Sequence, residues 1–188
     1  MNKLKSFLFV AAIMVAVGAN AQFAIGLKAG LNLSTVTGEG ISEGISVDSK
    51  IGYKIGPTAE IGLGPTMAIQ AGALLSLKGS KDSDANYLEV PVCFAIKFPI
   101  AIDTKIYVNA GPYFGYGLFG KTKTIFGETF DTFDRIEKID YGATIGAGME
   151  VLKFNFGLNY DLGLANINKS SLNTTKNGNF WISIGCKF

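Results

Sequence analysis

Apolar and polar residues alternate along most of this chain with a period of two. In the last segment, every second position from Phe180 to Phe188 is apolar, whereas Ser183 and Lys187 stand between them. This is the period of a β-strand, whose successive side chains point to opposite faces. Eight such segments follow one another, at residues 23–34, 51–61, 67–78, 88–98, 106–115, 139–150, 154–163 and 180–188.

The length of the segments matches the thickness of a membrane. Each has nine to twelve residues, and eleven residues at about 3.3 Å each, tilted by about 40°, rise about 28 Å. The sequence therefore predicts an all-β fold, an eight-stranded antiparallel up-and-down transmembrane β-barrel.

The connections support hairpins with two kinds of end. Short connections are expected near 62–65, 99–104 and 151–153, and long polar loops near 35–50, 79–86, 119–138 and 165–178. Short turns at one end and longer loops at the other are typical of outer-membrane barrels. An even number of strands places both termini on the short-turn side, which is the periplasm.

The alternation alone leaves open which face is buried. A soluble barrel of the lipocalin kind would turn the apolar stripes inward and bind a ligand in the periplasm. Three features favour lipid outside: small glycines crowd the polar face, aromatic residues gather at both ends of the stripes, and Phe188 ends the chain in phase with them. The first aromatic group is Phe23, Phe98, Phe154 and Phe188, and the second is Tyr53, Phe114, Tyr116, Tyr141, Tyr160 and Phe180.

An outward apolar face puts a balanced set of charges inside. Buried charges must be paired or hydrated, and equal numbers of the two signs permit a network that plugs the lumen. An interior of eight strands leaves little room for a channel. The expected lumen charges are Lys28, Lys54, Glu60, Lys78, Glu89, Lys97, Asp140, Glu150, Asp161 and Lys187.

Prolines and cysteines add local expectations. Pro57, Pro91 and Pro112 fall inside strands, where each lacks a backbone donor, so we expect bulges there. Cys93 and Cys186 fall on opposite faces of the barrel wall, so we expect two free thiols.

The first 21 residues have the features of a signal peptide. Lys3 and Lys5 precede an apolar run of eleven residues, which is too short to span a membrane as a helix, and Ala19 and Ala21 frame a cleavage site. We expect residues 1–21 to be removed and 22–188 to form the barrel domain.

Composition excludes several functions. The chain has 17 basic and 15 acidic residues, and without Lys3 and Lys5 the two numbers are equal, so no basic field favours nucleic acid. The chain has no histidine, which removes Ser-His-Asp triads and histidine-ligated metals. We expect no catalytic centre, cofactor or metal; the spacing of Asp131, Asp134 and Glu137 matches no calcium loop.

Five further motifs lie at residues 26–34, 87–91, 111–117, 140–150 and 160–166. Together they resemble the porin-family outer-membrane β-barrel domain, the PorT-like relatives of the small OmpX/OmpA-type barrels. The resemblance covers nearly all of the mature chain and implies a barrel in the outer membrane, without a common ligand or reaction. Phe188 resembles the terminal signal read by the outer-membrane assembly machinery.

The leading hypothesis is a monomeric structural or interaction barrel of a Gram-negative outer membrane. Its expected partners are membrane lipid, lipopolysaccharide and, during biogenesis, the assembly machinery, while the partner of the loops stays open. Phe126, Phe130 and Phe133 pack on the rim or contact an external partner. The alternatives are the soluble ligand-binding barrel and a narrow pore.

Overall fold

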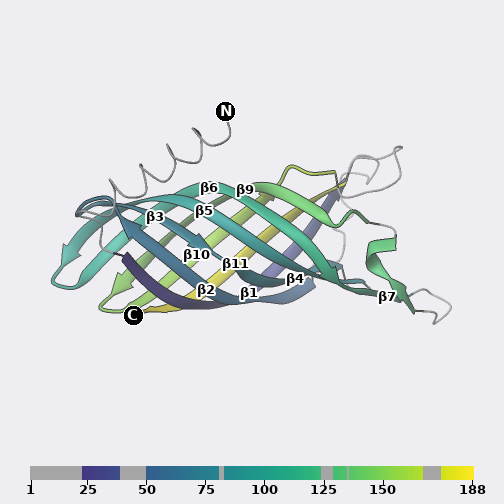
Figure 1. Ribbon diagram of the computed structural model, residues 1–188, viewed down its shortest axis with the longest axis horizontal. Coiled ribbons are helices and arrows are strands. Elements are labelled where there is room, and N and C mark those ends of the chain that lie inside the picture. The colour runs from purple at the N-terminus through teal and green to yellow at the C-terminus, as the bar shows by residue number, and fades with distance from the viewer. Residues whose placement is uncertain (1–22, 39–49, 81–82, 124–128, 135, 167–174) are drawn as a thin grey trace, which may run out of the picture.

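The computed structural model describes residues 23–38, 50–80, 83–123, 129–134, 136–166 and 175–188, and within them the strands close into a barrel (Figure 1). The expected signal peptide at 1–21 lies outside these residues. The strands of the wall are β1 (Phe23–Gly38), β2 (Lys50–Gly62), β3 (Met67–Gly72), β4 (Leu74–Ser80), β5 (Ser83–Ala101), β6 (Thr104–Phe119), β9 (Ile139–Val151), β10 (Phe154–Gly163) and β11 (Thr175–Lys187).

Pairing between the first and last strands closes the ring. β1 pairs with β11 on one side and β2 on the other, and β3 and β4 occupy one place in the wall because both pair with β2 and β5. The described residues thus form a ring of eight antiparallel strand positions. The predicted fold class is confirmed.

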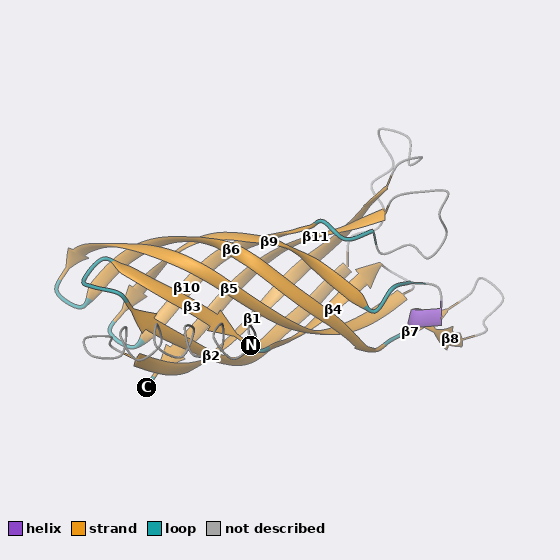
Figure 2. Ribbon diagram, turned by 45° about the horizontal axis from the view of Figure 1, so that its top comes forward, coloured by secondary structure: helices purple, strands orange, loops and turns teal. Residues whose placement is uncertain are grey.

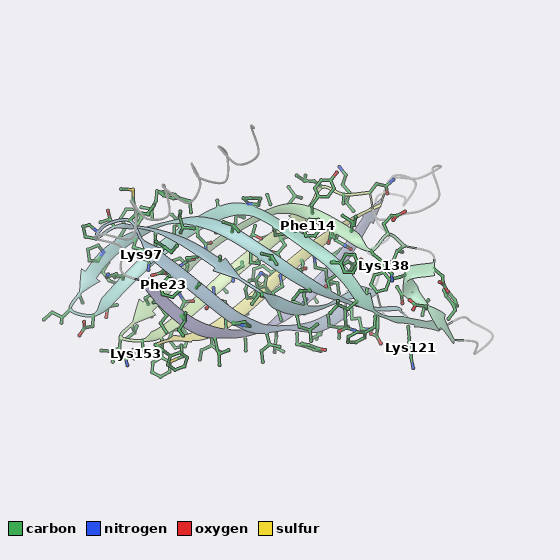
Figure 3. The ribbon with its side chains drawn as sticks, in the orientation of Figure 1. Phe23, Lys97, Phe114, Lys121, Lys138 and Lys153 are labelled. Atoms are coloured by element: carbon green, nitrogen blue, oxygen red, sulfur yellow. The ribbon has the colours of Figure 1, made fainter. Side chains whose placement is uncertain are left out.

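The apolar stripes point outward. Ile51 is 73% exposed and Leu31 66%, whereas Lys54 and Asn32 on the opposite faces of the same strands are 2% exposed. Aromatic side chains lie at both ends of the barrel, with Phe23 at one end and Phe114 toward the other (Figure 3). The alternative of a soluble barrel with inward stripes is therefore wrong.

The short turns are confirmed at one end, which we call the turn end. They fall at 63–66, 102–103 and 152–153. Asp103 and Leu152 have positive φ angles of 56° and 55°, and the Leu152 amide donates to the Asp103 carbonyl at 2.8 Å. The opposite end, where the longer connections lie, is called the loop end.

One predicted loop is wrong. The segment 79–86 is mostly sheet, because β4 continues to Ser80, β5 begins at Ser83, and these two residues pair. Asp84 makes an ion pair with Lys50. The polar residues here indicate that the hairpin leaves the membrane while its strands continue, since hydrogen bonding between strands does not require an apolar setting.

Two short strands and a 3-10 helix extend from the loop end. The predicted loop 119–138 contains β7 (Lys121–Lys123), β8 (Thr129–Asp131) and the 3-10 helix η1 (Thr132–Asp134), which project beyond the barrel (Figure 2). Among the described residues, no helix has the length and apolar character needed to cross a membrane.

The predicted bulges at the three prolines are wrong. The register of β2 with β1 is unchanged through Pro57, and that of β5 with β6 is the same before and after Val92–Cys93, which face Gly111–Pro112. The prolines interrupt strands without shifting them: Ala73, opposite Pro57, separates β3 from β4. Register shifts occur instead at Asn86/Tyr87 and Pro99/Ala101.

Candidate functional site: the charged lumen

The inner face carries two groups of ion pairs. The first, the turn-side network, consists of Glu60, Lys97, Glu150 and Lys187. Each lysine pairs with both glutamates, at N···O distances of 2.5 to 3.0 Å. The four residues come from β2, β5, β9 and β11, so this closed ring of alternating charge ties four strands together.

The second group, the central network, is a chain of five charges. It runs from Asp161 through Lys54, Glu89 and Lys78 to Asp140. Lys54 lies 2.6 Å from Asp161, and Lys78 lies 2.5 Å from Glu89 and 3.0 Å from Asp140. The side chains are 0 to 2% exposed. This chain of charges runs from β10 across the lumen to β2, β5 and β4 and returns to β9, the neighbour of β10 in the wall.

Neutral donors complete the shells of Asp161 and Asp140, the carboxylates at the two ends of the central network. Asp161 accepts hydrogen bonds from Thr144 at 2.7 Å and Asn179 at 3.2 Å. Asp140 accepts one from Asn177 at 3.1 Å and lies 3.4 Å from the Tyr113 hydroxyl. A buried charge is tolerated when ion pairs and hydrogen bonds replace its water shell, which these contacts do.

Aromatic rings flank the two central lysines. The Lys54 ammonium lies 4.7 Å from the centre of the Trp181 ring. Lys78 lies 4.8 Å from the ring centre of Tyr113 and 5.6 Å from that of Tyr87. A cation within about 6 Å of a ring face is attracted by the ring quadrupole. The rings also fill space that ions or water would otherwise occupy.

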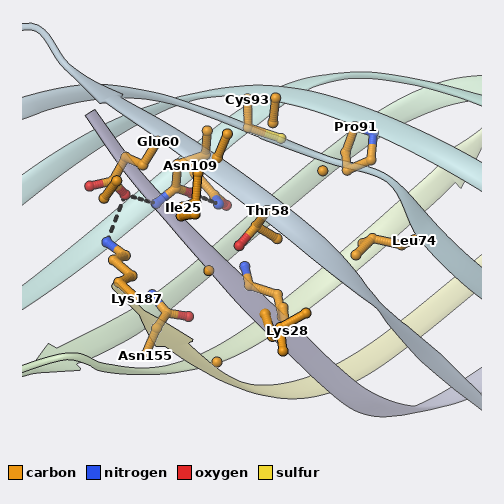
Figure 4. A pocket seen from close by; sticks show the side chains of 18 of the residues that line it. Ile25, Lys28, Thr58, Glu60, Leu74, Pro91, Cys93, Asn109, Asn155 and Lys187 are labelled. Carbon is orange, nitrogen blue, oxygen red and sulfur yellow. Dashed lines mark hydrogen bonds and ion pairs between the residues drawn. The ribbon is translucent and has the colours of Figure 1, made fainter.

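Lys28 stands apart from both networks. It lines a cavity of about 60 Å³ together with Glu60 and Lys187 of the turn-side network (Figure 4). Trp181, beside the central network, also lines this cavity. Among the described residues, no ion pair joins Lys28 to a carboxylate, and its ammonium lies 5.7 Å from the Trp181 ring centre.

The charges balance only over the whole lumen. The turn-side network is neutral, and the central network has three carboxylates against two ammonium groups. Lys28 supplies the missing positive charge at longer range. The structure thus brings nine of the ten expected lumen residues into ion pairs and places the tenth, Lys28, in the cavity between them.

A cover of loop residues lies over the loop end of the lumen. Phe133 of η1 is 3% exposed and packs edge-on against Tyr87, with ring centres 5.6 Å apart. Thr132 donates a hydrogen bond to the Asp84 carbonyl at 2.7 Å. A side chain at Gly117 would collide with the Phe133 ring. Of the three loop phenylalanines, Phe133 packs on the rim, Phe130 is half-buried and Phe126 lies outside the described residues.

The neutral partners were missed in the sequence, although a signal for them existed. Tyr87, Tyr113, Asn177, Asn179 and Trp181 all occupy the inward phase of their strands. The predicted phase assigns Tyr113 and Trp181 to the lumen, whereas Tyr87, Asn177 and Asn179 lie outside the predicted segments 88–98 and 180–188. Their pairing depends on which strands face each other across the barrel, and alternation within one strand does not specify that.

The remaining predictions concern the two cysteines, metal ligands and Phe188. Cys93 is buried and Cys186 half-buried, and both are free thiols as expected. No group of three potential metal ligands occurs among the described residues. Phe188 is 67% exposed, and its amide donates to the Ile25 carbonyl at 2.8 Å.

A closed ring of eight strands with an apolar outer face and a charged interior defines a small barrel of the outer membrane. The chain belongs to the outer membrane protein beta-barrel domain family, whose model matches residues 18–169. None of the curated proteins matches the sequence.

Solved structures are similar in fold. Neisserial surface protein A is 11% identical with a TM-score of 0.56, covering 90% of this chain and 99% of that one. Ail, the attachment invasion locus protein of Yersinia pestis, is 16% identical with a TM-score of 0.48, covering 89% and 99%. OprG from Pseudomonas aeruginosa is 11% identical with a TM-score of 0.47, covering 88% and 95%. At 11% identity, the similarity to Neisserial surface protein A shows the fold alone.

Proposed function

We propose that this outer-membrane barrel is closed to ions and acts as a structural or interaction protein through its loops. The observation that carries the proposal is the central network, which crosses the lumen with side chains 0 to 2% exposed. An ion passing this level would have to displace a lysine or a carboxylate from its partners, and breaking a buried ion pair costs about 3–5 kcal/mol. The proposal includes no catalytic role.

Planar-bilayer recording tests this function. The purified barrel, shown to be folded by heat-modifiable migration on a detergent gel, is expected to give no unitary conductance steps. Reproducible steps from the same folded preparation would overturn a closed lumen. Fractionation of cells supplies the companion measurement, since the protein is expected in the outer membrane.

A narrow pore is the second candidate, and the cavity beside Lys28 favours it. A cavity of about 60 Å³ has room for a few water molecules, which would hydrate the lumen beside Lys28. The same recording separates the two functions. Replacing Lys28 by Glu would change the ion selectivity of a pore and leave a closed barrel silent.

The orientation and the maturation of the chain are part of the proposal. Because the number of strands is even, the first strand begins and the last strand ends on the same side of the membrane. We assign that side to the periplasm and the loops to the exterior, where they meet lipopolysaccharide. We also propose cleavage after Ala21 and keep the PorT-like relationship as the finer family assignment. N-terminal sequencing of the mature protein is expected to begin at Gln22.

Phe188 is proposed as the assembly signal. Its ring is exposed at the turn end, and only its backbone is engaged by the closing strand β1. Replacing Phe188 with Ala is expected to lower the amount of assembled barrel in cells several-fold, with little change in refolding of the purified chain. An equal loss in both settings would indicate a packing role instead.

A further inference from the structure

The outer wall contains an apolar groove over β1, β2 and β3. Its volume is about 530 Å³. Ile25, Leu27 and Phe188, which are 54 to 67% exposed, border it. The full lining is Ile25, Gly26, Leu27, Pro57, Thr58, Ala59, Ala71, Gly72, Ala73 and Phe188.

Small residues create this groove. Outward positions elsewhere on the wall mostly carry Leu, Ile, Val, Phe or Tyr, whereas β2 and the β3–β4 strand present Pro57, Ala59, Ala71 and Ala73 side by side, with Ala59 paired to Ala71. The floor offers no free backbone donor to a peptide, since proline has no N–H and the Ala73 amide donates to the Pro57 carbonyl at 3.0 Å. These two positions therefore offer a peptide no donor, and the apolar lining favours an occupant made of hydrocarbon.

The groove is confined to one half of the membrane. Phe188 marks the turn end of the wall, and Ala73 stands six residues after Met67, where β3 begins at that end. Six residues at about 3.3 Å, tilted by about 40°, rise about 15 Å, which is half of a hydrocarbon core of about 30 Å. This is the depth reached by the acyl chain of one leaflet.

We propose that the groove binds one acyl chain of a phospholipid from the leaflet at the turn end. That leaflet is the periplasmic one if the orientation proposed above holds. The groove is continuous with the lipid-facing belt, and a chain lying in it contacts protein on several sides, which adds dispersion contacts. A symmetric dimer would place this concave patch against itself and leave the space unfilled.

Photo-crosslinking tests the site directly. The wild-type barrel is folded into vesicles of phosphatidylethanolamine and phosphatidylglycerol that contain a phosphatidylcholine with a diazirine in its acyl chain. Peptide mapping is expected to show adducts enriched several-fold around Ala59 and Ala71–Ala73. Adducts spread evenly around the belt would overturn the proposal, as would crosslinks between two copies of the barrel at these residues.

Filling the groove supplies the matched variant. The pair Ala71→Leu and Ala73→Leu is expected to abolish the enriched adducts, whereas Ala147→Leu, on the outward face of β9, leaves them unchanged. Persistent adducts in the filled variant would overturn the proposal. If the double variant does not show heat-modifiable migration, Ala59→Leu replaces it. The crosslinking test does not depend on orientation, because both leaflets of these vesicles have the same composition. Vesicles with lipopolysaccharide in place of phospholipid in the outer leaflet then test the orientation separately.

Discussion

Glu89 forms ion pairs with two lysines, Lys54 and Lys78. These contacts show how single residues stabilise the charges buried in the lumen. Lys54 also reaches Asp161, and Lys78 also reaches Asp140. Each ammonium therefore pairs with two carboxylates, so removing Lys78 takes away one of the two ion pairs of Glu89 and the ion pair of Asp140. Removing one partner of such a group costs much more than the pair itself contributes, because the other charge is left buried.

Lys78→Met is the sharpest test at this scale. Methionine keeps most of the volume but leaves Glu89 and Asp140 without the ammonium between them. We expect the free energy of unfolding to fall by roughly 3–5 kcal/mol. Urea unfolding from phospholipid vesicles, followed by the fluorescence of Trp181, the single tryptophan, measures it.

The control is Lys121→Met, which changes an exposed lysine of β7. Exposed ion pairs contribute about 0–1 kcal/mol, so this variant should unfold close to wild type. If both variants shift the midpoint equally, the central network does not stabilise the barrel.

Sequence patterns at the residue scale say which side chains point inward but not which ones meet. The phase of each strand placed all ten charges inside, because one apolar face must meet lipid. The contact between Lys54 and Asp161 joins strands that are not neighbours in the sheet. It depends on the curvature of the closed wall, which no single segment encodes.

At the scale of elements, the strands were predictable and the loop end was not. The eight alternating segments predict the strands of the wall, because a strand with lipid on one face and the charged lumen on the other alternates with a period of two. The sequence predicts a loop at the β4–β5 hairpin because its residues become polar where the strands leave the membrane. It leaves open whether Phe133 packs on the rim or contacts a partner, because Phe133 lies in a polar segment without periodicity.

Phe133→Ala is expected to loosen this cover without opening the barrel wall. Truncating a buried phenylalanine removes packing of about 3–5 kcal/mol, and the cover has few other apolar contacts. Trypsin should then cleave at Lys121 and Lys138 several-fold faster, while heat-modifiable migration is unchanged.

Two further variants define the cover experiment. Gly117→Val should behave like Phe133→Ala, because its side chain would occupy the place of the Phe133 ring. Phe119→Ala changes a phenylalanine that is 56% exposed and should digest like wild type. Digestion of Phe133→Ala at the wild-type rate would contradict the packing described.

At the scale of the whole molecule, the two halves of the chain carry opposite lumen charges. β1 to β5 contribute four lysines against two glutamates, and β9 to β11 contribute three carboxylates against one lysine. The surplus is two positive charges in the first part and two negative charges in the second. In a poorly solvated interior, such complementarity draws the parts together.

A barrel split within residues 124–128 tests this complementarity. The two pieces, co-expressed with separate signal peptides, are expected to assemble into a heat-modifiable complex. Asp161→Asn in the second piece should lower the yield of complex several-fold, because Lys54 loses one of its partners. Glu137→Gln, an exposed change in the same piece, should have no effect, and equal yields from the two variants would contradict the idea.

The distribution of charge among hairpins also limits how such a barrel can evolve. The β1–β2 hairpin and the β3–β5 hairpin each carry one surplus positive charge, β6–β9 carries two negative charges, and β10–β11 is neutral. Duplicating any one of the first three hairpins would concentrate like charge in the lumen, so the wall cannot grow by copying such a unit unchanged. Lys54 and Asp161 are 107 positions apart, yet we expect a change at one to be best tolerated with a compensating change at the other, so that distant codons of the gene vary together.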